Sequence, residues 1–99
     1  MDEAADFSEP VPLPITGELD LHVFRPNEIG QLIPDYLAEC RARGILQVRI
    51  VHGKGTGTLR TTVHRLVERL EGVESWVWPA GTGSGSWGAT WVYLRPLEG

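Results

Sequence analysis

The sequence contains very little cysteine and no long apolar run. Cys40 is the one cysteine among 99 residues, so an internal disulfide framework is excluded and a reducing compartment is expected. No apolar stretch reaches the roughly 20 residues that a membrane-spanning helix needs. The N-terminus is acidic and rich in proline, unlike a signal peptide. These absences predict a cytoplasmic protein without a membrane span.

The sequence also lacks an excess of basic residues. The formal net charge is −4, from 13 acidic and 9 basic residues. Four of the acids lie within the first ten residues, and 13 less these four leaves nine acidic residues against nine basic ones. A neutral body is poor evidence for tight, nonspecific nucleic-acid binding, which usually accompanies a basic excess. A local basic patch remains compatible with the sequence.

The composition divides the chain into a tail and one domain. Residues 1–14 hold four acids and three prolines, a composition typical of a mobile or loosely docked tail. Residues 15–99 are long enough for a single domain with a modest core. They contain no internal repeat, and the glycine- and serine-rich stretch 81–88 is expected to be a loop.

Hydrophobic periodicity predicts four strands and two helices. Alternation of polar and apolar residues predicts a strand at 18–22, and helical spacing predicts helices at 29–40 and 58–70. Further strands are expected at 45–51, 73–78 and 89–95. Pro34 lies inside the first helix, so we expect a kink there or a helix that begins near Ile33. Gly44 is expected to end that helix.

The order β-α-β-α-β-β predicts an α/β fold, a two-layer sandwich in which two helices cover one face of a four-stranded mixed sheet. Right-handed crossovers would make the first three strands parallel and the last antiparallel. The residues expected on the covered face are Leu19, Leu21, Val48, Ile50, Val73, Val77, Thr90, Val92 and Leu94. Those expected on the open face are Glu18, Asp20, His22, Gln47, Arg49, Trp76, Trp78, Trp91, Tyr93 and Arg95.

Three tryptophans and a tyrosine would then lie on a sheet face that no helix covers. Such a face requires a partner or a covering segment. It is suited to stacking unpaired bases, as in other sheet-based RNA-binding proteins. Coverage by the proline-rich tail and pairing of two copies in a homodimer remain open alternatives.

The stretch His52–Gly57 is a glycine-rich loop between a predicted strand and a predicted helix. Backbone N–H groups at a helix start can bind an anion, and glycine allows a phosphate to approach closely. The loop is not a Walker motif, because Gly55 rather than serine or threonine follows Lys54. Without further groups, glycine runs are more often plain turns.

Chemistry becomes possible if the first two strands are neighbours. Ligands bind outside the carboxyl ends of parallel strands, where Asp20, His22, His52 and Lys54 would meet. Two histidines can take and give protons during phosphodiester cleavage, while Lys54 and the N–H groups of the loop stabilise charge on phosphorus. The alternative is that these histidines only form hydrogen bonds in turns.

Other candidate sites have weaker support. Zn²⁺ would lack an evident third ligand beside the two histidines, and Mg²⁺ would find one certain carboxylate, on Asp20. We predict no metal site, although a divalent ion such as Mg²⁺ or Mn²⁺ is compatible with the chemistry. His64 is expected to be a solvated surface residue between Arg60 and Glu68. Cys40, on an apolar helical face, is expected in the core.

At these residues the sequence resembles the small MutS-related (Smr) domain family. The resemblance rests on Leu19-Asp20-Leu21-His22, on His52-Gly53-Lys54-Gly55, and on Gly88-Ala89-Thr90-Trp91-Val92. It covers residues 17–96 and implies a fold similar to the C-terminal domain of bacterial translation initiation factor three. With no room for the ATPase body of a MutS protein, the chain looks like a stand-alone form.

The resemblance also implies endonuclease activity, either DNA nicking or RNA cleavage, in some members at collided ribosomes. It assigns catalysis to Asp20, His22 and His52. The predicted nucleic-acid contacts are Gly53, Lys54, Gly55, Gly57, Arg49 and Trp91. Val23 stands where the family commonly has glycine, so the first strand is expected to run further or the substrate to sit differently.

Two functions therefore remain as predictions. The first is an endonuclease that favours RNA over DNA, because paired histidines suit metal-free cleavage through a 2′-hydroxyl. The second is a non-catalytic module that binds nucleic acid or a ribosome, which the neutral charge and Val23 favour.

Overall fold

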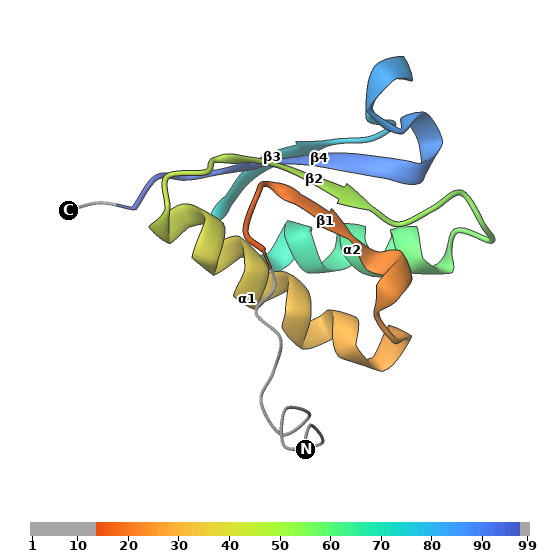
Figure 1. The fold of residues 1–99 in the computed structure, drawn as a ribbon, viewed down its shortest axis with the longest axis horizontal. Helices are drawn as coiled ribbons and strands as arrows, with labels where there is room; N and C mark the ends of the chain where they lie inside the picture. The colour runs from red at the N-terminus through yellow and green to blue at the C-terminus, as the bar shows by residue number, and fades with distance from the viewer. Residues whose placement is uncertain (1–13, 98–99) are drawn as a thin grey trace, which may run out of the picture.

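A computed structural model describes residues 14–97, so all but the last residue of the predicted tail lies outside the described residues. The predicted β-α-β-α-β-β order and the α/β fold class are confirmed. Two helices cover one face of a four-stranded mixed sheet (Figure 1). The elements are β1 (Glu18–Asp20), α1 (Ile29–Ala42), β2 (Gln47–Val51), α2 (Thr58–Arg69), β3 (Val73–Val77) and β4 (Ala89–Leu94).

The strand order β1-β2-β4-β3 places the C-terminal strand inside the sheet. β1 pairs with β2 in parallel, and β4 is antiparallel to both β2 and β3. The expected directions, three strands parallel and one antiparallel, are therefore confirmed. In register, Ile50 of β2 lies between Leu19 of β1 and Thr90 of β4. The ends of β1 and β2 and the start of β4 consequently share one end of the sheet.

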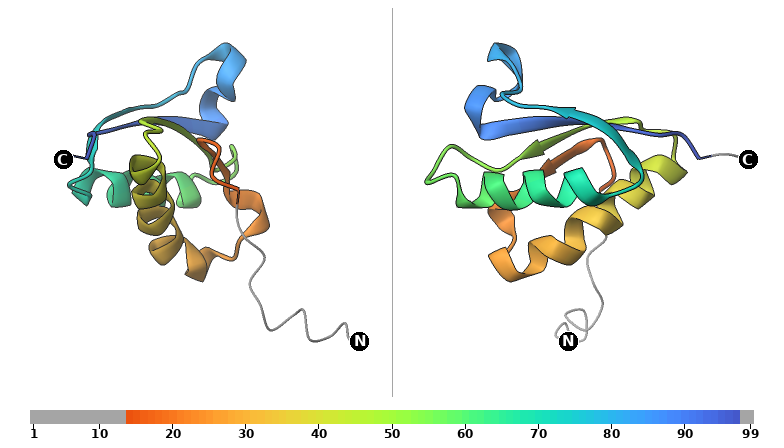
Figure 2. Two further views of the ribbon diagram at one scale, coloured as in Figure 1. Left: turned by 60° about the vertical axis from the view of Figure 1, so that its left-hand side comes forward. Right: turned by 180° about the vertical axis from the view of Figure 1, so that it is seen from behind.

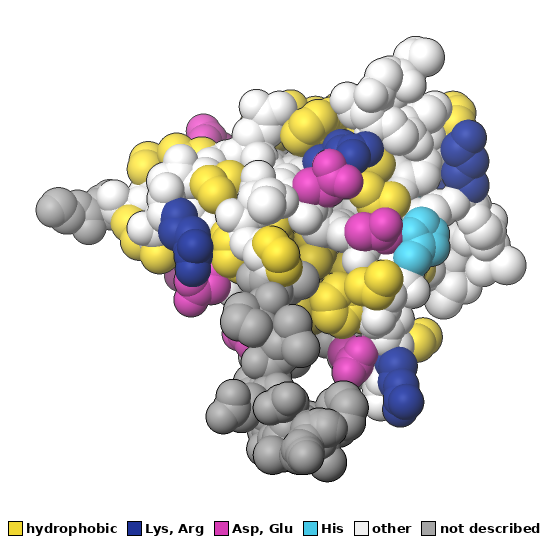
Figure 3. Space-filling view, viewed as in Figure 1, with side chains coloured by type: hydrophobic (Ala, Val, Ile, Leu, Met, Phe, Trp, Pro, Cys, Tyr) yellow, Lys and Arg dark blue, Asp and Glu magenta, His cyan; other side chains and the backbone are white. Residues whose placement is uncertain are grey.

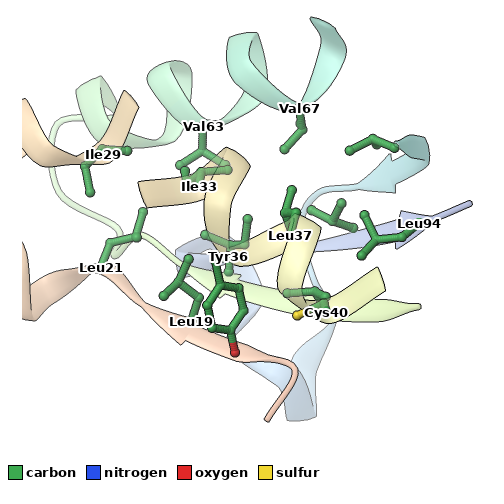
Figure 4. Packing of buried hydrophobic residues seen from close by; sticks show 14 residues of the cluster. Leu19, Leu21, Ile29, Ile33, Tyr36, Leu37, Cys40, Val63, Val67 and Leu94 are labelled. Atoms are coloured by element: carbon green, nitrogen blue, oxygen red, sulfur yellow. The ribbon is translucent and has the colours of Figure 1, made fainter. Parts of the chain in front are cut away.

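The core lies between the sheet and the helices (Figure 4). Helix α1 contributes Ile33 and Leu37, and α2 contributes Val63 and Val67, all of them buried. Burying a side chain of this size stabilises the fold by roughly 1.5–3 kcal/mol. Cys40 is buried as predicted, and burial raises the pKa of its thiol.

Tyr36 fixes the chain as it enters β1. Its hydroxyl accepts hydrogen bonds from the N–H groups of Thr16 and Gly17, at 3.3 and 3.1 Å. The same hydroxyl donates to the carbonyl of Glu18 at 3.1 Å. A ring buried in the core (Figure 4) thus sets the start of the strand that carries Asp20.

Helix α1 begins at Ile29 and continues through Pro34, so the alternative start near Ile33 is wrong. A 3-10 turn (Pro26–Glu28) precedes it, and the Glu28 carboxylate accepts from the N–H of Arg25 at 2.8 Å. This turn leads directly into α1, where Pro34 lacks the N–H that would bond the carbonyl of Gly30. Gly44 follows the helix at φ +77°, the left-handed conformation expected after a helix end.

Strand β1 is shorter than predicted, because it ends at Asp20. The Asp20 carboxylate accepts a hydrogen bond from the N–H of His22 at 2.9 Å, and residues Leu21–Val23 form a 3-10 turn. This local bond competes with continuation of the strand, as aspartate side chains often do. The expectation that Val23 extends the strand is wrong, and its side chain is exposed.

Strand β3 departs from simple alternation. A register shift between Val73 and Ser75 acts as a bulge, after which Trp76 lies opposite buried Val92. Val77, predicted on the covered face, is instead 50% exposed. Trp76 and Trp78, predicted on the open face, contact His64 of α2 instead. The bulge explains these errors, because one extra residue reverses the faces of all that follow.

Within residues 14–97, no helix has the length and apolar character needed to cross a membrane.

Candidate functional site

Three chain segments meet at one end of the sheet. They are the turn after β1, the glycine loop after β2, and the loop between β3 and β4, and all three lie at the same end of the molecule (Figures 1 and 2). The carbonyl of Gly88 accepts hydrogen bonds from the N–H groups of His52 and Gly53, both at 2.9 Å. Two of the three loops are thereby tied together directly.

Asp20 and His22 form an exposed pair. Nδ1 of His22 lies 2.7 Å from Oδ1 of Asp20, and the two side chains are 60% and 52% exposed. An exposed histidine touches an acidic side chain on the face shown in Figure 3. The backbone hydrogen bond from His22, helped by its ring and by Arg49, lowers the pKa of Asp20 despite partial burial. Asp20 is thus held as a carboxylate.

The carboxylate fixes how His22 presents its ring. Because an ionised carboxylate can only accept, Nδ1 of His22 carries the hydrogen and Nε2 of the neutral ring keeps a lone pair. Nε2 points at Gly53, where an added Cβ would lie 2.8 Å away. Gly53 also has φ +85°, which disfavours any other residue. Glycine is required here both for backbone conformation and for close approach to the ring.

His52 is buried, with 4% of its surface exposed. Nδ1 lies 3.0 Å from the carbonyl of Gly53, and Nε2 lies 2.9 Å from Oγ1 of Thr90. The same Thr90 oxygen lies 2.9 Å from Nε2 of His64. The prediction that His64 is a solvated surface residue is therefore wrong. Its ring stacks on Trp76 with a centroid separation of 4.3 Å.

The hydrogen-bond partners fix the direction of this chain of bonds. A carbonyl only accepts, so Nδ1 of His52 donates to Gly53 and Nε2 of His52 accepts from the Thr90 hydroxyl. The hydroxyl has then used its hydrogen, so Nε2 of His64 must donate to it. Within residues 14–97, no buried side-chain nitrogen or oxygen lacks a partner. Both histidines are neutral in this arrangement.

Burial keeps both rings neutral. Burial lowers the pKa of His52 against the opposing effect of its bond to Gly53, with Arg60 and His22 adding repulsion. The pKa of His64 falls to about 4, first through burial and then through His52 and Arg60. A charged ring would be poorly solvated in this site.

The glycine loop has fewer free donors than predicted. The N–H of Gly53 is bonded to Gly88 and does not face a ligand. The N–H groups of Gly55 and Gly57 have no acceptor among the described residues. Gly57 has φ +90° and caps α2, and the guanidinium of Arg60 folds back to within 2.9 Å of where its Cβ would be. The side chain of Lys54 is exposed beside them.

Arg49 and Trp91, the two remaining residues predicted to contact nucleic acid, line one side of the site. The Arg49 guanidinium donates to the carbonyl of Ser84 at 3.0 Å and pairs with Glu18 at 2.7 Å. The indole of Trp91 donates to the carbonyl of Ala80 at 3.0 Å. Both side chains are half-buried and hold the loop between β3 and β4 against the open face of the sheet.

Sequence reasoning missed Thr90, His64, Arg60 and Trp87 as parts of the site. A signal existed for Thr90, which was the one polar residue in the set expected on the covered face. A buried hydroxyl requires a partner, and that requirement points to a buried polar network. No comparable signal identified His64, because the bulge in β3 decides what lies against it.

Metal ligands are sparse around Asp20. Within residues 14–97, no three histidine, cysteine, aspartate or glutamate side chains gather as a metal-binding group. The Asp20 carboxylate already bonds His22 through one oxygen, and the Glu18 carboxylate pairs with Arg49. A divalent ion would find one carboxylate here, with its remaining ligands from water or a phosphate.

Comparison with known proteins agrees with this fold. Residues 19–95 match the model of the Smr domain family. The chain is 39% identical over 79 residues to Endonuclease MutS2 of Thermus thermophilus, a match that spans 80% of this chain and 10% of that protein. It is 37% identical to Endonuclease MutS2 of Thermomicrobium roseum, over 82% of this chain and 10% of that protein.

Two solved structures are similar in fold. The crystal structure of the Smr domain of Thermus thermophilus MutS2 matches with a TM-score of 0.75 and 38% identity, covering 82% of this chain and 100% of that one. The structure of YdaL, a stand-alone small MutS-related protein from Escherichia coli, matches with a TM-score of 0.70 and 25% identity. That match covers 80% of this chain and 64% of YdaL.

The chain belongs to the Smr domain family. It spans about a tenth of the length of the curated MutS2 relatives that it matches.

Proposed function

We propose that this domain is an endonuclease that cleaves phosphodiester bonds in nucleic acid, with RNA preferred over DNA. The observation that carries the proposal is the exposed Asp20–His22 pair, whose 2.7 Å bond through Nδ1 leaves Nε2 of His22 facing Gly53 of the glycine loop. The relatives named Endonuclease MutS2 support the reaction class.

In this proposal His22 is the general base. Nε2 takes a proton from a 2′-hydroxyl, or from water on a DNA strand, and that oxygen attacks phosphorus. The bond from phosphorus to the 5′ oxygen breaks, and the leaving oxygen takes a proton from solvent. On RNA the products are a 2′,3′-cyclic phosphate and a 5′-hydroxyl. Asp20 holds the tautomer of His22 and stabilises its imidazolium form.

The remaining predicted residues hold and neutralise the phosphate. Lys54 is exposed, and the N–H groups of Gly55 and Gly57 have no acceptor among the described residues, so these groups would stabilise charge that develops on phosphorus. His52 was predicted to transfer a proton or to orient the substrate. Its burial favours the second role, because both ring nitrogens are bonded within the domain. The N–H of His22 lowers the pKa of Asp20 most and Arg49 adds a smaller effect, while Trp91 holds the neighbouring loop.

One observation favours the second candidate, a module that binds nucleic acid or a ribosome without cleaving it. Acid–base cleavage by a pair of histidines needs both rings at the substrate, and here His22 alone is exposed. Binding without turnover that is lost in Lys54→Ala would support this candidate.

The test incubates the domain with labelled single-stranded RNA and with supercoiled and linear DNA, with and without EDTA. His22→Ala and Asp20→Asn are expected to lower the cleavage rate by roughly 100-fold or more, since a positioned general base contributes about 10²–10⁴-fold. His52→Ala distinguishes two roles for His52. Loss of a positioning residue should lower both the stability of the domain and the cleavage rate, whereas loss of a proton-transfer residue should lower the cleavage rate alone. Asp35→Asn is the matched control, because Asp35 is exposed on α1 and bonds only Gln31 among the described residues.

Two results would decide against the proposal. Cleavage that survives His22→Ala and Asp20→Asn unchanged would show that the activity lies elsewhere or comes from a contaminant. Cleavage of RNA that survives a 2′-deoxy substitution at the cut position would remove the 2′-hydroxyl step and the preference for RNA. A 2′,3′-cyclic phosphate end, detected by mass spectrometry, is the expected product.

A further inference from the structure

Trp87 is an exposed indole at the edge of the candidate site. It lies in the loop between β3 and β4 and is 55% exposed. The next residue, Gly88, is in contact with the glycine loop: a Cβ added there would lie 3.4 Å from Cγ of Lys54. A large apolar side chain thus stands in solvent one residue from the proposed phosphate site.

The loop holds Trp87 in a defined position. Ser86 donates its N–H to the carbonyl of Gly81, and Gly88 donates to Gly85, both at 2.9 Å. The N–H of Ala80 donates to the carbonyl of Ser86 at 2.9 Å, which closes the base of the loop. Ser86 itself has φ +51°, a left-handed conformation uncommon for serine. Such backbone outliers cluster at binding and catalytic sites.

Trp78 packs against Trp87 and hydrogen-bonds its backbone. Its indole nitrogen donates to the carbonyl of Trp87 at 2.9 Å, and the two rings meet edge to face with centroids 5.1 Å apart. The guanidinium of Arg60 lies over the Trp78 ring, 4.4 Å from its centroid. Arg60 therefore bridges the start of α2 to this pair of tryptophans, and its positive charge lies between the glycine loop and the indoles.

The geometry points to a stacking subsite for one unpaired base of single-stranded nucleic acid, formed by the exposed face of Trp87. The adjacent phosphate of that strand would lie at Lys54 and Arg60. A base in a duplex has both faces covered by its neighbours, so the subsite selects unstacked segments. This inference rests on the proposed function for the position of the phosphate, but binding to Trp87 does not require cleavage.

Charge argues for a strand rather than a second copy of this chain. In a symmetric dimer centred on Trp87, the same patch of both copies would meet. Lys54 and Arg60 of one copy would then face the same cations of the other, and like charges across an interface are unfavourable. A phosphate backbone instead brings the complementary charge to both side chains.

The test measures binding of a fluorescently labelled single-stranded oligonucleotide to protein that carries His22→Ala, so that the strand stays intact. Adding Trp87→Ala is expected to weaken binding by roughly 5- to 100-fold, the effect of losing one stacked base. Trp87→Phe, which keeps an aromatic face, should restore most of the affinity. Leu97→Ala is the control, because Leu97 is 56% exposed at the opposite end of β4.

A single abasic site moved along the oligonucleotide sharpens the test. At one position, loss of the base should weaken binding to the Trp87 protein and leave binding to Trp87→Ala unchanged. Equal affinity for the strand in proteins with and without the Trp87→Ala substitution would overturn the inference, whether or not wild-type protein cleaves. A Trp87-dependent dimer in sedimentation, with strand binding unaffected, would overturn it in favour of a protein contact.

A further outcome separates the two proposals. If wild-type protein cleaves none of the substrates, and Trp87→Ala still binds the oligonucleotide more weakly, the stacking subsite stands and the nuclease proposal fails.

Discussion

The hydroxyl of Thr90 lies 2.9 Å from Nε2 of His52, so the central strand β4 and the glycine loop share a buried hydrogen bond. The same oxygen accepts from His64 of α2. One side chain therefore joins the sheet, the loop and a helix directly behind the exposed His22. The position of the loop therefore depends on a buried network.

Replacing Thr90 by valine tests this network. Thr90→Val keeps the shape of the side chain but leaves a nitrogen of His52 and a nitrogen of His64 without their partner. We expect a loss of about 1–3 kcal/mol in the free energy of unfolding, the usual cost of a buried polar group left unsatisfied. Urea denaturation measures it. Thr61→Val makes the same change on the exposed side of α2 and should cost little; equal effects at both sites would contradict the network.

The stability of the domain should fall as the pH falls from 6.5 toward 4. The pKa of His64 in the folded domain is about 4, below its ordinary value of 6.5, so the unfolded chain takes up a proton first. The stabilisation is complete above pH 6.5 and is lost as the pH falls through 4. The lowered pKa of His52 acts in the same direction.

His64→Gln isolates this effect. The glutamine amide can still donate to Thr90 but does not titrate, so the decrease in urea midpoint between pH 7.5 and 5 should become smaller. Arg65→Gln, on the exposed side of the same helix, should leave that decrease unchanged. An unaltered pH dependence in His64→Gln would show that His64 is not held neutral by the fold.

Gly53→Ala should impair the Asp20–His22 pair without touching either residue. The new Cβ would lie 2.8 Å from Nε2 of His22, and φ +85° is strained for alanine. We expect the ring to be displaced, with a drop of tenfold or more in any cleavage activity and a lower melting temperature. Gly55→Ala is the control in the same loop, since a Cβ there meets nothing within 4 Å. Similar losses in both variants would mean that the effect does not come from the contact between residue 53 and His22.

Arg49→Met should loosen the loop between β3 and β4. The guanidinium connects Ser84 of that loop to Glu18 of β1, and methionine keeps only the apolar stem. Faster amide hydrogen exchange at residues 81–88 is the expected outcome, because the loop loses a charged anchor. Arg43→Met, which removes an exposed pair with Glu39 on α1, should leave exchange in that loop unchanged.

Much of the fold and part of the candidate site could be predicted from local sequence patterns. Alternation identified Leu19 and Ile50 as core residues, and the glycine-rich motif identified the loop after β2, whereas the turn at His22 was expected to be strand. These features depend on neighbouring residues, so a single sequence reveals them. Strand order depends on contacts between residues that are far apart in the sequence, and the insertion of β4 between β2 and β3 was not predicted.

The errors have long-range causes. Trp76 was assigned to the open face because strict alternation was assumed, and one bulged residue in β3 reversed it. Helical periodicity puts His64 on the outer side of its helix, between Arg60 and Glu68, whereas Thr90, which it contacts, is 26 residues away. The position of His52 just after the second strand predicts a place at the substrate, but tertiary packing buries its side chain.

The central place of β4 has a consequence for synthesis of the domain. Among the described strands, β3 pairs only with β4, and β2 pairs with β4 along one edge. On the ribosome, β2 and β3 are made before β4, the strand that joins them. A nascent chain that ends before Ala89 therefore leaves unpaired the edges of β2 and β3 that β4 covers, and such edges are sites for aggregation or for chaperones. The sheet, and the loops that it orders, can close only when the last strand has left the exit tunnel.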